Sequence, residues 1–449
     1  MTHKDKKIKY DTLIIGGGIS GITACYSLLN KKKDVVLIEK SSHIGGRAFS
    51  FFDPSTKEII DNGQHVIVGA CKNFINLISD LGLKNKIVNS KNFRVPVVAG
   101  GKTSYLGSRN IPSIVGLAWS IISYSHLKKS DRFKVIFGLL KILMSDIEKE
   151  TNKHKIFKDW LKGNKQNSST IKYFWNIIIK PALNDHIEKI DTKYALFVIK
   201  KTFLQSQKNL FLGYPSVALS DLWQPIEKKM SSSKSSTIKK GRVKKLILEK
   251  NLITAAELSN GEVIQANTFV TTIPQKDLFQ LFKESEISID SKLNKKELNN
   301  SPIVGIHFWF DKLVMKENYL ASADGETQWI FNVSKNHQEK NFHIVISQSA
   351  AWNWINQEKE DLKNIFLKEI TKILPKSKHA KLLKYSIVKQ PNATFRCTPE
   401  SDESRDIKLP SIENLFISGD WTKTRWPSTM ESAVISGNKV ANTVLNYMS

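Results

Sequence analysis

A glycine-rich turn between an apolar strand and a helix constrains the fold of this chain more than any other feature. Residues 16–21 read GGGISG and fit the pattern GxGxxG. The apolar run 10–15 before them predicts a strand, and residues 19–30 after them predict a helix. A further apolar run, 35–39, ends in Glu39 roughly 20 residues after the turn, as dinucleotide-binding units do. The first part of the chain is therefore expected to form a βαβ unit that binds a dinucleotide.

The residues of this turn have distinct physical tasks. Gly16 permits the tight turn, Gly18 lets the backbone approach a pyrophosphate, and Gly21 lets the helix pack closely on the sheet. The helix N-terminus offers backbone N–H groups and a positive dipole end to the phosphates. Glu39 can accept hydrogen bonds from ribose hydroxyls. A glycine turn without a ligand is the alternative, and the complete βαβ context argues against it.

A second glycine pair lies just beyond this unit. Gly45, Gly46 and Arg47 begin six residues after Glu39. An arginine at this point suits a second contact with the pyrophosphate. A GGR element that follows a GxGxxG unit resembles the amine oxidase and phytoene desaturase superfamily of flavoproteins. The resemblance implies that the cofactor is FAD.

The C-terminal part of the chain resembles the same superfamily. Residues 416–420 (FISGD) resemble the strand whose final acid binds the ribityl chain. Residues 427–433 (PSTMESA) resemble the helix start that points at the flavin ring, where a helix N-terminus would stabilise negative charge. Residues 243–274 predict a hairpin, and in relatives the residue that matches Val243 meets the adenine through its backbone. The residues expected to bind FAD are Gly16, Gly18, Ile19, Ser20, Gly21, Glu39, Lys40, Gly45, Gly46, Arg47, Gly63, Gln64, His65, Val243, Gly419, Asp420, Met430, Glu431 and Ala433.

The resemblance also implies an architecture for the whole chain. The fold class is α/β, with a Rossmann-like FAD-binding domain of the glutathione-reductase type and an inserted α+β substrate domain. The FAD-binding domain is expected to be discontinuous and to comprise residues 1–95, 220–280 and 385–449. The substrate domain is then expected to comprise residues 96–219 and 281–384.

Local patterns predict further elements. The serine- and lysine-rich stretch 230–240 is typical of a loop, and residues 146–170 are polar and helical, with Trp160 and Leu161 as the expected packed residues. Other expected elements are a turn at Asn260-Gly261, strands at 302–310, 342–347 and 415–418, and a helix at 430–445.

A short polar motif narrows the family. Residues 61–65 read DNGQH, which resembles the squalene-associated flavoproteins, the hydroxysqualene dehydroxylases. Residues 181–184 (PALN) and 393–395 (ATF) resemble the same group, whereas Arg425 and Trp426 replace the small residues usual there. The implied reaction is reductive removal of an allylic hydroxyl from hydroxysqualene, which gives squalene for hopanoid or squalene synthesis. A carotenoid-type desaturase or isomerase, a generic flavin amine oxidase and a non-catalytic flavoprotein scaffold remain alternatives.

His65 is the first candidate for a catalytic acid. A leaving hydroxyl must be protonated or stabilised by a donor, and the resulting allylic cation needs a dry, apolar pocket. In this hypothesis Gln64 and Asp61 orient His65. In the alternative, Asp61 and His65 hydrogen-bond to the backbone and fix a loop beneath the flavin.

Two apolar runs indicate contact with a membrane surface. Residues 111–127 and 133–147 are compatible with helices, but each is too short to span a bilayer. A water-insoluble isoprenoid substrate would require such contact, and the runs could lie in the interface with nearby cations on lipid phosphates. These cations are Lys128, Lys129, Arg132, Lys134 and Lys141. The alternative is that both runs are core helices of the substrate domain.

Composition adds broad bounds. The net charge of +26 indicates a surface that attracts phosphates, although a lysine-rich genome would produce the same excess. The lysines are spread along the chain without a nucleic-acid motif, so no nucleic-acid partner is expected. The three cysteines predict neither a disulfide framework nor a metal site. A cytoplasmic protein, peripheral on the inner face of an anionic membrane, is expected; the electron donor and the oligomeric state stay open.

Overall fold

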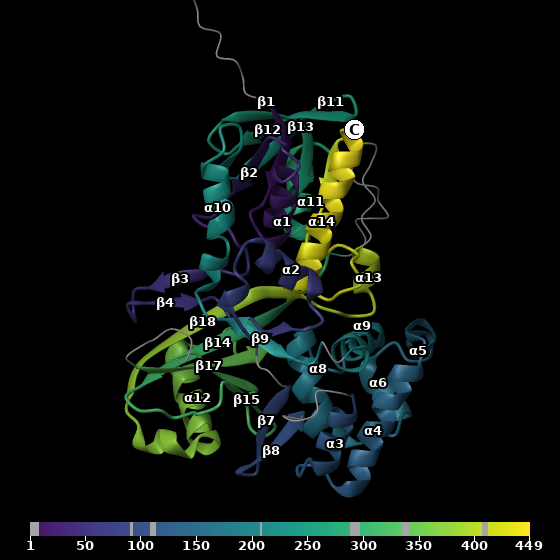
Figure 1. Ribbon diagram of the computed structural model, residues 1–449, viewed down its shortest axis with the longest axis vertical. Helices are drawn as coiled ribbons and strands as arrows, with labels where there is room; N and C mark the ends of the chain where they lie inside the picture. Colours follow the sequence, from purple (N-terminus) through teal and green to yellow (C-terminus); the bar gives the residue numbers. More distant parts are fainter. Residues whose placement is uncertain are drawn as a thin grey trace, which may run out of the picture.

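The computed structural model describes residues 9–89, 93–107, 114–206, 209–287, 297–334, 341–405 and 412–449 (Figure 1). Its first large sheet contains the predicted nucleotide-binding unit. The strand order is β10-β2-β1-β13-β12-β11, and β19 also pairs with β13, on the edge away from β1. The pairs that involve β1, β2, β10 and β19 are parallel, whereas β11, β12 and β13 form an antiparallel meander. The strands are β1 (Lys9–Ile15), β2 (Val35–Glu39), β10 (Thr237–Lys240), β11 (Val243–Glu249), β12 (Leu252–Leu258), β13 (Val263–Thr271) and β19 (Leu415–Ile417).

Helices cover this sheet because its central strands are apolar along their length. Residues 13–15 of β1 and 35–38 of β2 are buried, as expected for parallel strands packed on both faces. The long C-terminal helix lies against α1, and a Cβ at Gly437 would come within 2.5 Å of the Ser20 carbonyl oxygen. The helices around this sheet are α1 (Ile19–Leu29), α2 (Lys72–Asp80), α10 (Gln224–Ser231), α11 (Gln275–Glu284) and α14 (Met430–Tyr447).

The second large sheet lies below the first in Figure 1. Its order is β18-β14-β17-β16-β15-β7-β8, and α12 packs on one face through Leu362, Phe366 and Ile370. Alternate residues of β14 face that helix, as the two-residue period of a strand requires. The elements are β7 (Arg94–Ala99), β8 (Lys102–Gly107), β14 (Asn300–Phe310), β15 (Tyr319–Ser322), β16 (Trp329–Asn332), β17 (Phe342–Ser349), β18 (Leu382–Phe395) and α12 (Lys359–Ile373).

A helical region lies beside this second sheet (Figure 1). Phe157, Trp160, Phe174 and Trp175 form its aromatic core, with Trp160 and Leu161 buried as predicted. Its helices are α3 (Ile114–Ser123), α4 (Lys129–Met144), α5 (Ile147–Lys153), α6 (Phe157–Gly163), α7 (Ser168–Thr170), the π-helix η2 (Ile171–Trp175), α8 (Asn176–Leu183), α9 (Thr192–Ile199) and the π-helix η3 (Lys200–Leu204). Residues 111–113 of the first apolar run lie outside the described residues.

Smaller elements connect the two sheets. A hairpin, β3–β4, precedes the DNGQH motif, and a three-stranded sheet joins β5 and β6 to β9. These elements and the remaining short helices are β3 (Ser50–Asp53), β4 (Glu58–Asp61), β5 (Ile67–Val68), β6 (Ile87–Asn89), β9 (Leu212–Pro215), η1 (Lys84–Lys86), η5 (Leu219–Leu222), η7 (Pro375–His379) and α13 (Ser401–Ser404).

The structure corrects two expectations. Residues 230–240 are not a continuous loop, because Thr237–Lys240 forms the edge strand β10 along β2. Half-exposed edge positions tolerate the lysines that made this stretch resemble a loop. The predicted boundary at residue 385 cuts β18, which pairs with β14 in the second sheet up to Phe395. The boundary at residue 95 likewise falls inside β7.

Candidate functional site

A single cavity of about 770 Å³ runs from the glycine-rich turn of the first sheet into the helical region beside the second. Its size is within the range of small-molecule and cofactor sites. One end is lined by Gly16, Glu39 and Val243, and the other end is lined by Phe174 and Trp329. The cavity therefore places a predicted nucleotide site and an apolar chamber in one continuous space.

The glycine-rich turn has the geometry expected of a nucleotide cradle. Gly16 has a φ of +102°, and a Cβ at Gly21 would lie 2.0 Å from the Gly16 carbonyl oxygen. The Glu39 carboxylate accepts hydrogen bonds from the Gly17 N–H at 2.6 Å and the Ser41 N–H at 2.8 Å. Among the described residues, no side chain caps the N-terminus of α1. Its N–H groups are therefore available to phosphate oxygens.

The second glycine pair packs directly on the first turn. The Gly45 N–H donates to the Gly17 carbonyl at 2.7 Å. A Cβ at Gly46 would lie 2.9 Å from the Gly18 Cα, and Gly46 has a φ of +59°. The Trp223 indole N–H donates to the Ala48 carbonyl at 2.9 Å and closes the back of this loop. The two glycine segments thus form one wall, in which a side chain at Gly45 or Gly46 has no room.

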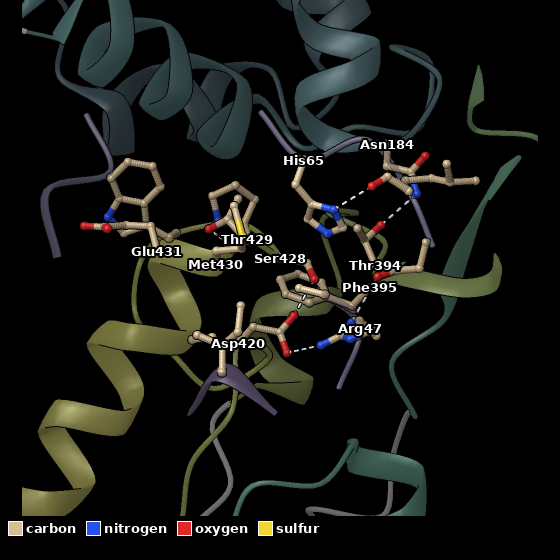
Figure 2. A pocket seen from close by; sticks show the side chains of 18 of the residues that line it. Arg47, His65, Asn184, Thr394, Phe395, Asp420, Ser428, Thr429, Met430 and Glu431 are labelled. Carbon is tan, nitrogen blue, oxygen red and sulfur yellow. Dashed lines mark hydrogen bonds and ion pairs between the residues drawn. The ribbon is translucent and has the colours of Figure 1, made fainter. Parts of the chain in front are cut away.

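Arg47 joins the N-terminal and C-terminal motifs. Its guanidinium forms an ion pair with the buried Asp420 carboxylate and donates to the Ala393 carbonyl at 3.2 Å. The Ser428 hydroxyl also donates to Asp420. Figure 2 shows Arg47, Asp420 and Ser428 together in the cavity. Predicted contacts for the pyrophosphate and the ribityl chain therefore lie next to each other.

Other predicted cofactor residues also line the cavity, but some of their side chains are engaged elsewhere. Ile19, Gly63, Gln64, Gly419, Met430 and Ala433 belong to the lining. Lys40 pairs with Asp277 at 3.0 Å, and the Ser20 hydroxyl is hydrogen-bonded to that of Ser418 at 2.6 Å. Gly21 is outside the lining and acts in helix packing.

Glu431 has a structural role that the sequence pattern does not reveal. Its buried carboxylate accepts hydrogen bonds from the Asn73 N–H at 3.1 Å, the Asn73 amide at 2.7 Å and the Phe74 N–H at 2.8 Å. These donors lie in the first turn of α2, where a negative charge is stabilised by the helix dipole. The start of α14 is thereby attached to the start of α2.

The orientation of the His65 ring is fixed by a backbone hydrogen bond. Its Nδ1 donates to the Gly63 carbonyl at 2.8 Å, which leaves Nε2 with a lone pair in the neutral ring. Burial lowers the pKa of His65 below 6.5, although the Gly63 hydrogen bond and the Asp61 charge oppose this. Asp61 lies outside the cavity lining and accepts hydrogen bonds from Ser50 at 2.6 Å and the Leu219 N–H at 3.2 Å. This arrangement favours the loop-fixing interpretation and makes neutral His65 a hydrogen-bond acceptor. The acid role stays a prediction.

Polar residues opposite this loop were only indirectly indicated by the sequence. Asn184 lies in a left-handed conformation, with φ 50° and ψ 41°, at the end of α8. Its amide donates to Thr394 Oγ1 at 2.9 Å and to the Ser301 carbonyl at 3.1 Å, and its carbonyl accepts from the Ala350 N–H at 2.7 Å. The PALN and ATF segments contain Asn184 and Thr394, but their pairing depends on the tertiary fold.

Apolar side chains line the remainder of the cavity. They come from α3, α4, η2, α8, α9, η3, β16 and the residue before β7, and no local pattern identified them. They include Phe93, Leu117, Leu139, Phe174, Trp175, Ile177, Val198, Phe203, Trp329 and Phe331. Core and chamber residues have the same amphipathic spacing in the sequence, so only their arrangement in space separates them.

Comparisons with known proteins identify relatives of this chain. A match to the family described as flavin containing amine oxidoreductase covers residues 19–445. The chain is 25% identical over 462 residues to a 15-cis-phytoene desaturase of an Oncidium hybrid cultivar, covering 97% of this chain and 78% of that protein. It is 22% identical over 442 residues to a hydroxysqualene dehydroxylase of Sinorhizobium fredii, covering 96% and 98% of the two chains. The structure of cyclohexylamine oxidase from Brevibacterium oxydans superposes with a TM-score of 0.72 at 15% identity, covering 98% and 99% of the two chains.

Proposed function

The chain belongs to the flavin containing amine oxidoreductase family, and on this premise we propose that it transfers hydride between flavin and the carbon chain of a long isoprenoid. Its cofactor is FAD. The proposed reaction is reductive removal of the allylic hydroxyl of hydroxysqualene to give squalene. The observation that carries the proposal is the continuity of the cavity between the nucleotide cradle and the apolar chamber.

The residues of the cradle fit FAD. The α1 N-terminus and the Gly45–Gly46 wall would hold the pyrophosphate, because their backbone N–H groups can be approached closely. Glu39 would bind the adenosine ribose with its remaining lone pairs. Val243 would face the adenine, and Asp420 would bind the ribityl chain. Arg47 neutralises Asp420 and would approach the pyrophosphate as well.

Dehydroxylation is supported by the DNGQH motif and by the similarity to the dehydroxylase of Sinorhizobium fredii. When bound, reduced FAD would supply the hydride that replaces the hydroxyl at the allylic carbon. The carbon–oxygen bond would break, and the hydroxyl would leave as water with a proton taken from solvent. The apolar chamber would exclude bulk water from the allylic carbon during this exchange. The protein's own contribution would be orientation, exclusion of water and hydrogen bonding to the hydroxyl.

Desaturation of a polyene precursor is a second candidate. It is favoured by the Nδ1 hydrogen bond and lowered pKa of His65 and by the similarity to the phytoene desaturase. Desaturation would need a hydride acceptor, which oxidised FAD would supply when bound, and a base that takes a proton from the neighbouring carbon. A neutral imidazole with a free lone pair can accept such a proton.

Anaerobic turnover distinguishes these reactions. Photoreduced holoenzyme is mixed with hydroxysqualene, oxidised holoenzyme is mixed with phytoene, and the extracted lipids are separated by chromatography. We expect squalene from the first mixture and unchanged phytoene from the second. A desaturated product from phytoene, with no squalene from hydroxysqualene, would contradict dehydroxylation and support desaturation. Oxidation of simple amines, or no turnover with any substrate, would indicate an amine oxidase or a non-catalytic flavoprotein instead.

We also propose that the outer face of α3 and α4 contacts a membrane surface. No helix within the described ranges is long and apolar enough to cross a bilayer. On α4, however, one face is buried while side chains spaced three or four residues apart project outward, so the helix is apolar on both sides. The exposed apolar residues of α4 include Phe133 (67%), Phe137 (48%), Leu140 (48%) and Met144 (76%), and α3 adds Trp119 (64%).

The chamber lies directly behind this face. Leu117 of α3 and Leu139 of α4 line the cavity, so the exposed face and the chamber share two helices. Lys128 and Lys129 are exposed at the start of α4 and could meet lipid phosphates. Arg132, by contrast, donates to the Leu127 carbonyl and has less freedom to do so. We therefore propose a cytoplasmic protein that attaches peripherally to the inner face of an anionic membrane.

Vesicle flotation tests the membrane contact. We expect the wild-type protein to float with vesicles that contain phosphatidylglycerol, and a Phe133→Ser/Phe137→Ser variant to bind roughly tenfold more weakly. Leu252→Ser, which alters an exposed leucine on β12, is the matched control and should float as the wild type does. Equal flotation of all three proteins would contradict the assigned face.

A further inference from the structure

Thr394 is prepared to donate a hydrogen bond into the cavity. The side-chain oxygen of Asn184, Oδ1, accepts a hydrogen bond from the Ala350 N–H. This contact fixes which end of the side-chain amide is the NH₂ group. That NH₂ group donates to Thr394 Oγ1 at 2.9 Å. Within the described part of the chain, the Thr394 hydroxyl has no acceptor of its own. Its proton is therefore available to a ligand.

His65 offers the complementary group. Its Nδ1–H is used by the Gly63 carbonyl, so Nε2 can only accept while the ring is neutral. Figure 2 shows His65 and Thr394 directed into the same part of the cavity, with Asn184 behind Thr394. Ala393, the neighbour of Thr394, accepts a hydrogen bond from Arg47, which places this part beside the Arg47–Asp420 pair.

A donor and an acceptor together match the hydrogen-bonding capacity of an alcohol. A hydroxyl group donates one hydrogen bond and accepts others, whereas a hydrocarbon chain does neither. We propose that Thr394 and His65 form a hydroxyl-recognition site that selects an alcohol over the hydrocarbon of the same skeleton. Thr394 donates to the substrate oxygen, and Nε2 of His65 accepts the substrate O–H. This inference rests on the proposed function and specifies its substrate class.

The surroundings make this discrimination effective. Phe174, Trp175 and Trp329 line the adjoining chamber, so a bound chain leaves little water to replace a missing hydroxyl. A site whose polar groups stay unpaired when the hydroxyl is absent rejects the hydrocarbon more strongly than the sum of its contacts implies. Asn184, whose amide donates to Thr394 of β18, also donates to the Ser301 carbonyl of β14. Its side chain is therefore held between these two strands.

Ligand binding without turnover tests the site. Oxidised holoenzyme is titrated with hydroxysqualene and with squalene, and the change in flavin absorbance gives Kd for each. We expect wild-type protein to bind hydroxysqualene at least tenfold more tightly. Thr394→Val, which keeps the shape and removes the hydroxyl, should reduce this preference about fivefold or more and leave the squalene Kd unchanged. Thr394→Ser, which retains the hydroxyl, should keep the preference, and His65→Phe should reduce it.

The outcomes separate this inference from the proposed function. Equal Kd values for the two ligands in wild-type protein, or an unchanged preference in Thr394→Val, would overturn the hydroxyl-recognition site even if squalene is still produced. Loss of preference in Thr394→Val with retention in Thr394→Ser supports the site whichever direction the hydride moves. Absence of binding to both ligands would overturn the proposed function and the site together.

Discussion

Glu431→Gln removes the charge that fastens α14 to α2, and its effect can be worked from the contacts. The wild-type carboxylate accepts three hydrogen bonds, two from Asn73 on Oε1 and one from the Phe74 N–H on Oε2. Glutamine keeps one oxygen and turns an NH₂ group toward at least one of these donors. A buried donor left without an acceptor costs about 1–3 kcal/mol, and the lost charge at the helix N-terminus costs a further 0.3–1 kcal/mol, so a total of about 1–4 kcal/mol is expected.

Urea unfolding of the holoenzyme, followed by far-UV circular dichroism, measures this loss. Glu286→Gln is the matched control, because that side chain is 87% exposed and its replacement should change stability by less than about 0.5 kcal/mol. Glu431→Ala, which loses all three acceptors and leaves a void, should be destabilised by about 3–5 kcal/mol. If Glu431→Gln unfolds at the same urea concentration as Glu286→Gln, the assignment of Glu431 as the capping carboxylate of α2 is wrong.

Three further predictions concern the cradle, the hydroxyl site and a buried acid. Gly46→Ala should weaken FAD binding at least tenfold, because the new Cβ would meet Gly18 at 2.9 Å. Flavin fluorescence on dilution measures this loss. Gly100→Ala is the control and should bind FAD as the wild type does, because Gly100 has a similar φ of +56° and nothing within 4 Å of the new Cβ. The preference for hydroxysqualene should be constant above pH 6.5 and fall at lower pH as His65 gains a proton, in titrations repeated across the pH range. Burial raises the pKa of Asp191 from 3.8 to about 6, so its contribution to stability is present at low pH and is lost as pH rises through 6. Asp191→Asn should therefore gain about 2–3 kcal/mol relative to the wild type between pH 4 and pH 8 in urea unfolding, and a constant difference would refute this.

The glycine-rich turn and the elements around it were predictable because these residues are close in sequence and under local constraint. A tight turn that approaches a phosphate requires glycine, and the strand before it and the helix after it have clear periodicity. Gly16, Gly18 and Glu39 therefore lie where the pattern predicts. The class of fold follows from the same βαβ signal and agrees with the superposed oxidase structure.

The tertiary structure alone decided which distant side chains meet and which atoms they form hydrogen bonds with. Asn184 orients Thr394 across 210 positions of sequence, and Arg47 reaches Asp420 across 373, so no local spacing encodes either contact. The sequence identified His65 as a candidate acid, and the fold adds that its Nδ1 is hydrogen-bonded to the Gly63 carbonyl and that burial lowers its pKa. Glu431 belongs to a predicted flavin-binding helix start, yet its carboxylate caps α2. Local patterns determine backbone geometry, whereas hydrogen-bond partners and protonation depend on which elements the whole fold packs together.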